Sequence, residues 1–278
     1  MILINVLLAL FVVCFGLNLA LYIVKWYDAV NLHRTPDNPS WRAGLKPWSM
    51  AKGIFLESAA IFFCLVTYPL HFVFDRMPRS PEPSSKPPVL LVHAWGTASH
   101  SFLLVRRLLK RLGYANIYSI TYRPITGDAA ALARQVADKI DLVLSQTGAA
   151  RIVIITHSMG GVLTRYAIKN LGADGKVEKV IALGGPHMGS RIAVLAPIGL
   201  NTLQMTYQSA FTQELAQGGM TPGTARYVSI YSDFDNFVLP PSSSDLGPGA
   251  KNITVPYHGH LYLVYSPQVL KIIRQELP

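Results

Sequence analysis

The sequence has few charged residues and almost no cysteine. Charged residues make up 14% of the 278 residues, whereas soluble domains contain about a quarter. No charged residue at all occurs from Ile2 to Val24. The two cysteines, Cys14 and Cys64, both fall in apolar runs. The remainder of the chain therefore contains no disulfide, and cysteine usage does not indicate a compartment.

Other absences exclude whole classes of protein. The formal net charge is +10, but the basic residues are scattered and no nucleic-acid-binding motif accompanies them. We therefore expect no nucleic-acid partner. The positive charge could attract anionic lipid head groups or simply keep the protein in solution. The sequence also has no internal repeat and no heptad pattern, which excludes solenoids and coiled coils.

Two long apolar runs stand near the amino terminus, at about residues 2–24 and 53–74. Each is long enough to cross a hydrocarbon core of about 30 Å as a helix. The first has no basic residues before it, which disfavours a cleaved signal peptide. The second contains Glu57, close enough to its end to reach the membrane interface. We predict two transmembrane helices; the alternative for the second is a helix on the membrane or in the core.

The connection Lys25–Lys52 between the runs predicts the orientation. Lys and Arg favour the cytoplasmic side of a membrane, and this connection holds Lys25, Arg34, Arg42, Lys46 and Lys52. We therefore expect a multi-pass protein of the bacterial inner membrane, with everything after Phe74 in the periplasm.

The chain divides into three parts by composition. Residues 1–75 form the membrane anchor, residues 76–87 a tether rich in proline and serine, and residues 88–278 the globular domain. Short apolar runs alternate with helical patterns in that domain, which predicts an α/β fold with a mostly parallel, doubly covered sheet. Expected strands are 89–92, 117–121, 151–156, 177–183, 227–231 and 252–255, and expected helices are 101–112, 128–145, 159–171 and 266–277.

The strongest motif is Thr156-His157-Ser158-Met159-Gly160-Gly161, where a buried strand runs directly into a helix. A serine on such a tight turn requires small neighbours two positions before and after it, which is the physical basis of the G-x-S-x-G motif. Gly160 meets this requirement, whereas Thr156 stands where glycine is usual. The motif predicts Ser158 as a nucleophile; the alternative is a serine that only caps a helix.

A serine nucleophile needs a base, and the base needs an acid that orients it. In folds of this kind the acid and then the histidine follow the serine in the chain. The loop after the fifth expected strand offers Asp233 and Asp235, and the loop after the sixth offers His258 and His260. We favour Asp235 and His260, and leave the other two as alternatives.

Acyl transfer also needs donors for the oxyanion. One is expected to be the backbone N–H of Met159, directly after the nucleophile. The other is expected from the loop after the first strand, and we choose the N–H of Trp95.

These segments resemble the small bacterial triacylglycerol lipases of the α/β-hydrolase superfamily. The resemblance covers about two-thirds of the chain and is carried by VLLVHAWGTASHSF, VIITHSMGGVLTRY, IALGGPHMGS, VSIYSDFDNFV and GHLYLVYSPQV. It implies the triad Ser158, Asp235 and His260, with no cofactor and no metal. Such lipases usually have a histidine-glycine pair in the first segment, whereas this chain has His93-Ala94.

The function expected from these features is hydrolysis of carboxylic esters with lipid-like substrates, through an acyl-enzyme on Ser158, by a membrane-anchored enzyme. The apolar stretch from Ile192 to Gly219 is either a cap over the acyl pocket or ordinary core helix. Alternative functions are a thioesterase, phospholipase or acyltransferase with the same triad, because the triad serves all of these reactions. An inactive hydrolase fold that only binds is the remaining alternative.

Overall fold

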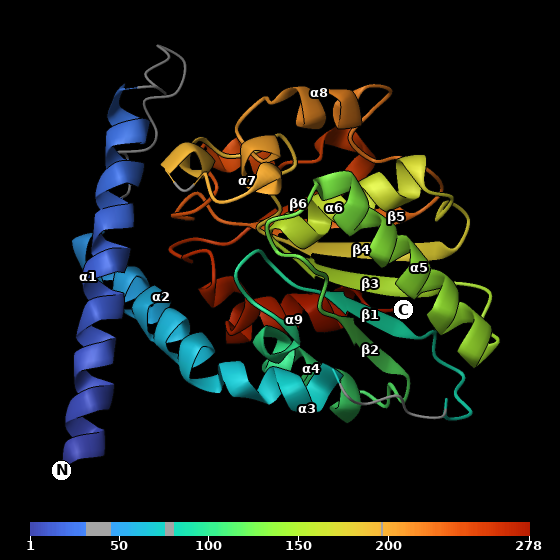
Figure 1. The fold of residues 1–278 in the computed structure, drawn as a ribbon, viewed down its shortest axis with the longest axis horizontal. Coiled ribbons are helices and arrows are strands. Elements are labelled where there is room, and N and C mark those ends of the chain that lie inside the picture. Colours follow the sequence, from blue (N-terminus) through green and yellow to red (C-terminus); the bar gives the residue numbers. More distant parts are fainter. Residues whose placement is uncertain (32–45, 76–80, 196) are drawn as a thin grey trace.

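A parallel sheet forms the centre of the protein, as the sequence predicts. The computed structural model describes residues 1–31, 46–75, 81–195 and 197–278 (Figure 1). Within these residues the strands follow the order β2-β1-β3-β4-β5-β6, and every neighbouring pair is parallel. The strands are β1 (Val89–Val92), β2 (Ile117–Ile120), β3 (Ile152–His157), β4 (Val177–Leu183), β5 (Arg226–Tyr231) and β6 (Ala250–Thr254).

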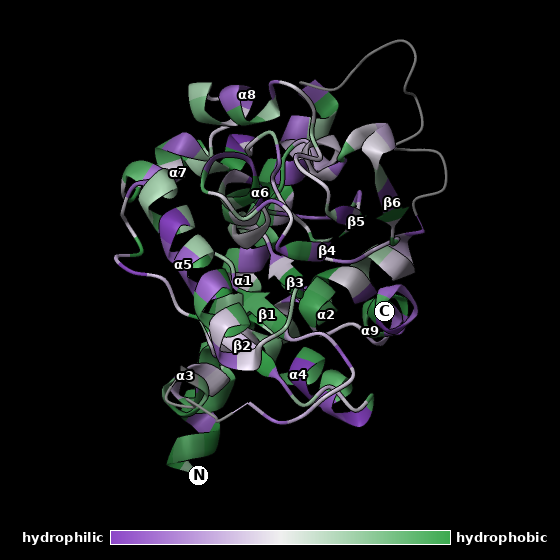
Figure 2. Cartoon of the chain, turned by 90° about the vertical axis from the view of Figure 1, so that its right-hand side faces the viewer, coloured by the Kyte–Doolittle hydropathy of each residue, from purple (hydrophilic) through white to green (hydrophobic). Residues whose placement is uncertain are grey.

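Helices cover both faces of the sheet, and alternate strand residues point to opposite faces. Leu90 and Val92 of β1 belong to one hydrophobic cluster, whereas Val89 and Leu91 belong to another. The first cluster contains side chains of α5 (Ala129–Thr147), α6 (Met159–Asn170) and α8 (Ala210–Ala216). The second contains side chains of α4 (Leu103–Arg111) and α9 (Pro267–Glu276). Figure 2 shows the hydrophobic strands β1 and β3 enclosed between these layers.

The remaining short elements connect these layers. Helix α7 spans Leu200–Gln204 and helix α3 spans His71–Asp75. Turns of 3₁₀ helix occur at Tyr68–Leu70, Ser99–Phe102, Arg191–Leu195, Pro241–Ser244, Gly247–Gly249 and Tyr262–Val264. The expected helix 101–112 is thus a 3₁₀ turn followed by α4.

Two apolar helices precede the sheet, α1 (Ile2–Asn31) and α2 (Pro47–Thr67). Both segments are long and apolar enough to be candidate membrane spans by length and composition. Phe11 of α1 makes edge-on ring contacts with Phe55 and Phe62 of α2, at centroid distances of 5.9 and 5.6 Å. Figure 1 shows the amino-terminal end of α1 projecting beyond the rest of the protein. Helix α1 is longer than the expected 2–24.

The second apolar run lies within the candidate span Pro47–Phe74, in which Pro69 interrupts the regular α-helix. Helix α2 ends at Thr67, and a 3₁₀ turn that contains Pro69 leads into α3. Proline lacks the N–H that an uninterrupted helix needs. The expected helix 53–74 thus falls within this candidate span, with a 3₁₀ turn near its carboxyl-terminal end.

Contrary to the expectation from the sequence, the side chain of Glu57 does not reach a membrane interface. Its side chain is fully buried, and its carboxylate accepts hydrogen bonds from the backbone N–H groups of Leu261 (2.9 Å) and Tyr262 (2.7 Å). Further along α2, Ala60 and Cys64 belong to the hydrophobic cluster on the α4 and α9 side of the sheet. This face of α2 packs on the globular domain, which agrees with the alternative that the second run is a helix in the core. The Glu57 carboxylate is bound by backbone N–H groups instead of water.

The expected tether is only partly described, because residues 76–80 lie outside the described residues. Its later part contacts the domain. Glu82 and Asn116 exchange two hydrogen bonds, of 3.0 and 2.8 Å, and Lys86 Nζ donates to the carbonyl of Leu112 at 2.5 Å. The division into anchor, tether and domain remains a prediction.

Candidate active site

Ser158 occupies a strained turn between β3 and α6. Its φ and ψ are 55° and −128°, a conformation that a residue with a side chain adopts only when its surroundings impose it. Gly160 allows the close approach that this turn requires, because an added Cβ would lie 2.4 Å from the carbonyl oxygen of Val92. The turn thus holds the first residues of α6 against the carboxyl end of β1.

Thr156 stands two residues before Ser158, where glycine is usual, and the fold accommodates it at Gly161. The threonine side chain is fully buried. A Cβ built on Gly161 would lie 3.2 Å from Thr156 Oγ1 and 3.1 Å from the His187 ring. The local adjustment that threonine requires is therefore the absence of a side chain at position 161.

His260 and Asp235 meet beyond the carboxyl ends of the strands. His260 Nδ1 is 2.8 Å from Asp235 Oδ2, and both side chains are nearly fully buried. The other carboxylate oxygen of Asp235 accepts hydrogen bonds from the N–H groups of Phe237 (2.8 Å) and Val238 (2.9 Å). Because both oxygens have partners, the carboxylate is fixed in the orientation in which it accepts a hydrogen bond from Nδ1–H.

This environment changes the basicity of His260. Burial on its own lowers the pKa of His260, but the charge and hydrogen bond of Asp235, together with the charge of Glu57, outweigh burial and leave the pKa above its ordinary value of 6.5. With Nδ1 donating to Asp235, Nε2 is the ring nitrogen that can take up a proton.

The alternative residues lie in different surroundings. Asp233 is exposed. His258 uses both ring nitrogens, with Nδ1 2.7 Å from the carbonyl of Pro256 and Nε2 2.6 Å from the hydroxyl of Ser266. Burial lowers the pKa of His258 below its ordinary value, although the bond to Pro256 opposes this. The structure therefore pairs His260 with Asp235 and places His258 in a separate hydrogen-bonded group.

His157 connects the serine turn with the histidine loop. Its Nε2 donates to the carbonyl of His260 at 3.1 Å, and the two rings lie 4.7 Å apart. Burial, and then the proximity of His260, hold the pKa of His157 well below its ordinary value. This contact joins the residue before Ser158 to the loop that carries His260, and within the described part of the chain the Ser158 hydroxyl makes no hydrogen bond to the His260 ring. Such bonds often tighten only with substrate bound.

The two expected oxyanion donors lie on the segments that the serine turn brings together. Met159 is the first residue of α6, and Trp95 lies in a turn closed by a 3.3 Å hydrogen bond from Thr97 N to the Ala94 carbonyl. Gly96 takes the positive φ of this turn, at 73°. The chain therefore does not need glycine at position 94, where Ala94 is buried.

The loop after β4 is a buried support rather than a second polar site. His187 is almost fully buried, and burial followed by the charge of Arg165 holds its pKa well below the ordinary value. Arg165 donates to the carbonyls of His187 (3.2 Å) and Met220 (2.7 Å). Burial lowers the pKa of Arg165 to about 10. The arginine fixes this loop through backbone carbonyls.

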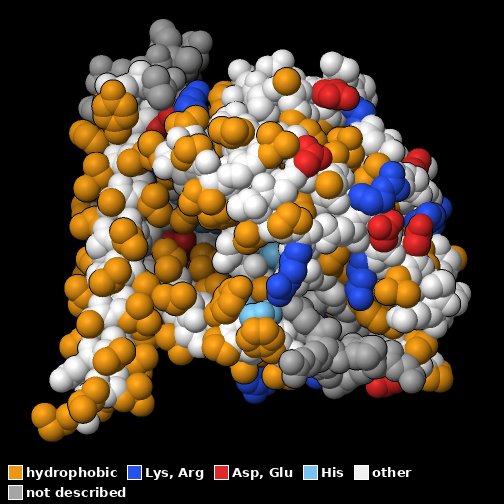
Figure 3. Space-filling model, in the orientation of Figure 1, with side chains coloured by type: hydrophobic (Ala, Val, Ile, Leu, Met, Phe, Trp, Pro, Cys, Tyr) orange, Lys and Arg blue, Asp and Glu red, His pale blue; other side chains and the backbone are white. Residues whose placement is uncertain are grey.

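An apolar rim lies on the α7 side of the site. Its exposed members are Val194, Leu195, Ile198, Leu200, Leu203 and Phe237. The Phe237 ring lies with its centroid 5.2 Å from that of the His260 ring, so this member of the rim contacts the histidine. Hydrophobic side chains are visible in the α7 region and along α1 in Figure 3. Exposed apolar side chains gathered at one place often mark a binding surface.

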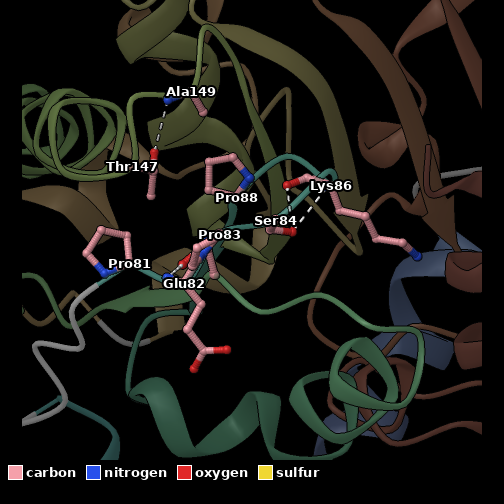
Figure 4. Close-up of a pocket in the computed structure, with 9 residues that line it drawn as sticks. Pro81, Glu82, Pro83, Ser84, Lys86, Pro88, Thr147 and Ala149 are labelled. Atoms are coloured by element: carbon pink, nitrogen blue, oxygen red, sulfur yellow. Dashed lines mark hydrogen bonds between the residues drawn. The ribbon is translucent and has the colours of Figure 1, made fainter.

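A cavity of about 260 Å³ lies elsewhere, at the amino-terminal edge of the sheet (Figure 4). Its walls include Pro88 before β1, Asn116 before β2 and Ala149 before β3. Ser158 follows the carboxyl end of β3, so this cavity is separated from the serine by the length of the sheet. Among the described residues, no group of three or more His, Cys, Asp or Glu could hold a metal ion.

Sequence reasoning did not find three polar residues next to the pair formed by His260 and Asp235. Asn236 accepts a hydrogen bond from the N–H of His260 and donates to Asn18 of α1. Glu57 of α2 binds the two residues after His260. The available signal was the isolation of Asn18 and Glu57 within apolar runs, because a buried polar group needs a partner.

Known proteins similar to this chain include lipases. Residues 86–265 match the model of the family described as Lipase (class 2). Lipase B from Aspergillus fumigatus has a TM-score of 0.64 at 17% identity, covering 81% of this chain and 72% of that chain. The mature lipase BlEst2 from Bacillus licheniformis has a TM-score of 0.59 at 18% identity, covering 73% of this chain and 95% of that chain. At these identities the two structures show the α/β-hydrolase fold.

Proposed function

Because the chain belongs to the class 2 lipase family, we propose that it hydrolyses carboxylic esters through an acyl-enzyme on Ser158. The observation that carries this proposal is the His260–Asp235 pair at 2.8 Å, placed beyond the same sheet edge as the strained Ser158 turn. A serine hydroxyl is a poor nucleophile until a base takes its proton, and this arrangement supplies the base and its orienting acid.

In the acylation step, His260 Nε2 takes the proton of Ser158 Oγ while Oγ bonds to the ester carbonyl carbon. The N–H groups of Met159 and Trp95 stabilise the negative charge on the carbonyl oxygen. His260 then gives its proton to the leaving alcohol, and the bond between carbon and alcohol oxygen breaks. Asp235 keeps the imidazole oriented and stabilises its protonated form.

In the deacylation step, water replaces the alcohol. His260 takes one water proton while the water oxygen bonds to the acyl carbon. The bond to Ser158 Oγ then breaks as His260 returns the proton to the serine. The products are the carboxylic acid and the original enzyme, so no cofactor is required.

The apolar rim supports a lipid-like acyl group as the substrate. Val194, Leu195, Ile198, Leu200 and Leu203 are each at least half exposed, and Phe237 extends the rim to His260. Covering such surface with an acyl chain is favourable by about 25 cal/mol per Å² of apolar area removed from water. We therefore infer that turnover improves with acyl length.

We also propose that the protein attaches to a membrane, with α1 as the segment that enters it. Ile2, Leu8, Val12 and Leu17 of α1 are more than half exposed. The described ends of the Lys25–Lys52 connection contact the globular domain: Asp28 pairs with Arg191 at 3.1 Å, and Lys46 N donates to the Tyr257 hydroxyl at 3.2 Å.

These contacts favour one membrane topology. While they persist, the basic connection and the globular domain lie on the same side of any membrane. We infer that α1 enters the membrane by its amino-terminal half and that the domain faces the cytoplasm, since basic residues favour that side. Two full spans with a periplasmic domain, as expected from the sequence, would require the hairpin to leave the domain.

The experiment that tests the activity is fluorophosphonate labelling and hydrolysis of p-nitrophenyl esters from acetate to palmitate. We expect labelling and turnover in the wild type and in Ser145→Ala, an exposed serine on α5. Ser158→Ala should lose the label and at least about 1000-fold in kcat, because it removes a triad member.

Two outcomes would overturn the proposal. Full esterase activity in purified Ser158→Ala would exclude the serine as nucleophile. A folded wild type that neither takes the label nor turns over any ester would favour the binding-protein alternative. Thioester and competing-alcohol substrates, tested alongside, distinguish thioesterase and acyltransferase activity from hydrolysis of oxygen esters.

A further inference from the structure

We propose that Glu57 and Asn18, on the two amino-terminal helices, are positioning residues that hold His260 and Asp235 in their catalytic arrangement. The inference rests on the proposed function. It assigns to the helical hairpin a role inside the active site, in addition to any role in attachment.

Glu57 holds the backbone directly after His260. Its two carboxylate oxygens accept separate hydrogen bonds, Oε1 from Leu261 N at 2.9 Å and Oε2 from Tyr262 N at 2.7 Å. Gly259, directly before His260, makes room for this carboxylate, because an added Cβ would lie 2.4 Å from Glu57 Oε2. The acid from α2 thus contacts the chain on both sides of the catalytic histidine.

Asn18 holds the same loop from the other helix, through Asn236. Asn18 Oδ1 accepts from Asn236 Nδ2 at 2.8 Å, and Asn236 Oδ1 accepts from His260 N at 3.1 Å. Asn18 is itself fixed to α2, since its amide donates to Ser58 Oγ at 2.8 Å and to the Ile54 carbonyl at 3.0 Å. Asn236 directly follows Asp235, so one hydrogen-bond chain joins α1 to both members of the pair.

The hairpin contacts around these bonds are close. The rings of Tyr22 and Phe234 lie 4.7 Å apart. A Cβ on Gly53 would lie 2.7 Å from the Tyr257 carbonyl and 2.8 Å from Phe234. The glycine therefore lets α2 approach the loop that leads to His260, at a distance where Glu57 reaches its partners.

A buried carboxylate is unfavourable unless its hydrogen bonds compensate for lost hydration. If position 57 of α2 served only for packing, an apolar side chain would be sufficient there. Within the described residues, Glu57 is the acceptor for the N–H groups of both Leu261 and Tyr262, so replacing the acid leaves buried donors without a partner. The chain thus keeps a carboxyl group at a place where it fixes the backbone next to the histidine.

Glu57 also acts on His260 electrostatically. The charged groups facing His260 are Asp235, from the loop after β5, and Glu57, from α2. His157 from β3 packs against its ring, and Lys25 of α1 lies near Asp235 and Asp233. Because Glu57 raises the pKa of His260, loss of its charge moves the acidic limb of the rate profile to lower pH.

The test compares Glu57→Gln with Glu214→Gln, which removes one exposed carboxylate from α8. Glutamine presents an NH₂ group where Glu57 accepts from a backbone N–H. We expect kcat for a p-nitrophenyl ester to fall about 10- to 100-fold, as misplaced catalytic groups do, with KM changed less than threefold. The acidic limb of kcat/KM should move to lower pH. Glu214→Gln should match the wild type in both.

A second pair of variants tests α1. Asn18→Ala removes the link to Asn236, whereas Asn31→Ala removes an exposed asparagine of the same helix. We expect a lower kcat only for Asn18→Ala, without a shift of the acidic limb, because Asn18 carries no charge.

The outcomes separate this inference from the proposed function. If the wild type is active and Ser158→Ala is not, but folded Glu57→Gln keeps wild-type kcat and pH profile, Glu57 has no positioning role. If Glu57→Gln does not fold, Glu57→Asp replaces it: the charge remains but the reach is shorter, so kcat should fall while the acidic limb stays near its wild-type position. Wild-type kcat in Glu57→Asp would equally overturn the inference. An inactive wild type would instead contradict the proposed function.

Discussion

His258 and His260 show how hydrogen-bond partners give identical side chains different chemistry. His258 has partners on both nitrogens, a carbonyl and a hydroxyl, so its ring is held in place without a charged neighbour. His260 has a carboxylate on Nδ1 and leaves Nε2 for proton transfer. Only the second arrangement stabilises an imidazolium during reaction.

The opposite pKa directions of these two histidines give a prediction for activity. His260 has to be neutral to take the serine proton, and its pKa lies above 6.5. We therefore expect kcat/KM to rise with pH through a single ionisation above 6.5 and to be low in acid. His258→Gln should retain this profile and at least about a third of wild-type kcat/KM, whereas His260→Gln should lose about 1000-fold or more.

The measurement is a kcat/KM profile for a p-nitrophenyl ester between pH 5 and 9, on all three proteins, with circular dichroism to verify folding. A profile that is flat across neutral pH, or one that follows His258 rather than His260, would show that the wrong histidine has been chosen.

Among the elements, the strands and the helix starts follow closely from the sequence. Buried parallel strands are apolar along their whole length, and Val89–Val92 and Ile152–His157 are buried at every position. Helix α5 begins after Asp128, whose carboxylate accepts from Ala131 N at 3.0 Å. Local patterns of this kind are readable because one element alone determines them.

The cap of α5 gives a prediction about stability. Asp128 satisfies a backbone N–H in the first turn, and its other oxygen accepts from Gln204 Nε2 at 2.7 Å. Asp128→Ala should lower the free energy of unfolding by about 1 kcal/mol, the usual loss for an N-cap. Asp138→Ala, an exposed acid within the same helix, should change it by less than about 0.5 kcal/mol. Equilibrium urea denaturation of both variants checks this, and an equal effect of the two would refute the capping role.

The hairpin was less predictable, since one apolar sequence suits both lipid and a protein core. Helix α2 has a face in the hydrophobic cluster through Ala60 and Cys64 and a lone acid bonded to the loop after His260. Composition indicates only that this run avoids water. Which surroundings it has depends on contacts with residues about 200 positions later in the chain, and no local pattern encodes those contacts.

The same contacts limit how the whole molecule meets a membrane. From Asn18 onward, α1 makes polar contacts with the domain through Asn236 and Arg191. At a rise of about 1.5 Å per residue, residues 2–17 span about 24 Å, somewhat less than a hydrocarbon core of about 30 Å. Residues 2–17 make none of these polar contacts with the domain, so we expect this amino-terminal half of α1 to be the part that enters the membrane while the domain stays docked.

This geometry predicts which substitution detaches the enzyme. Leu8 is exposed near the middle of the amino-terminal half of α1, and a lysine at the centre of an inserted helix costs about 3 kcal/mol. Leu8→Lys should move most of the protein from the membrane pellet to the supernatant after cell lysis. Leu142→Lys, an equally apolar exposed position on α5, should leave it in the pellet. Activity toward a short soluble ester should be within threefold of wild type in both, because the catalytic pair is untouched.

Protease accessibility determines the side of the membrane in the same preparations. In intact spheroplasts of a bacterial host, added protease should spare the domain, and it should digest the domain once the membrane is opened. This follows from the Asp28–Arg191 and Lys46–Tyr257 contacts, which keep the basic connection and the domain on one side. Digestion in intact spheroplasts would instead favour two spans and a hairpin separated from the domain. The Glu57 carboxylate would then lie in lipid without its backbone partners, so that Glu57→Gln would leave kcat unchanged.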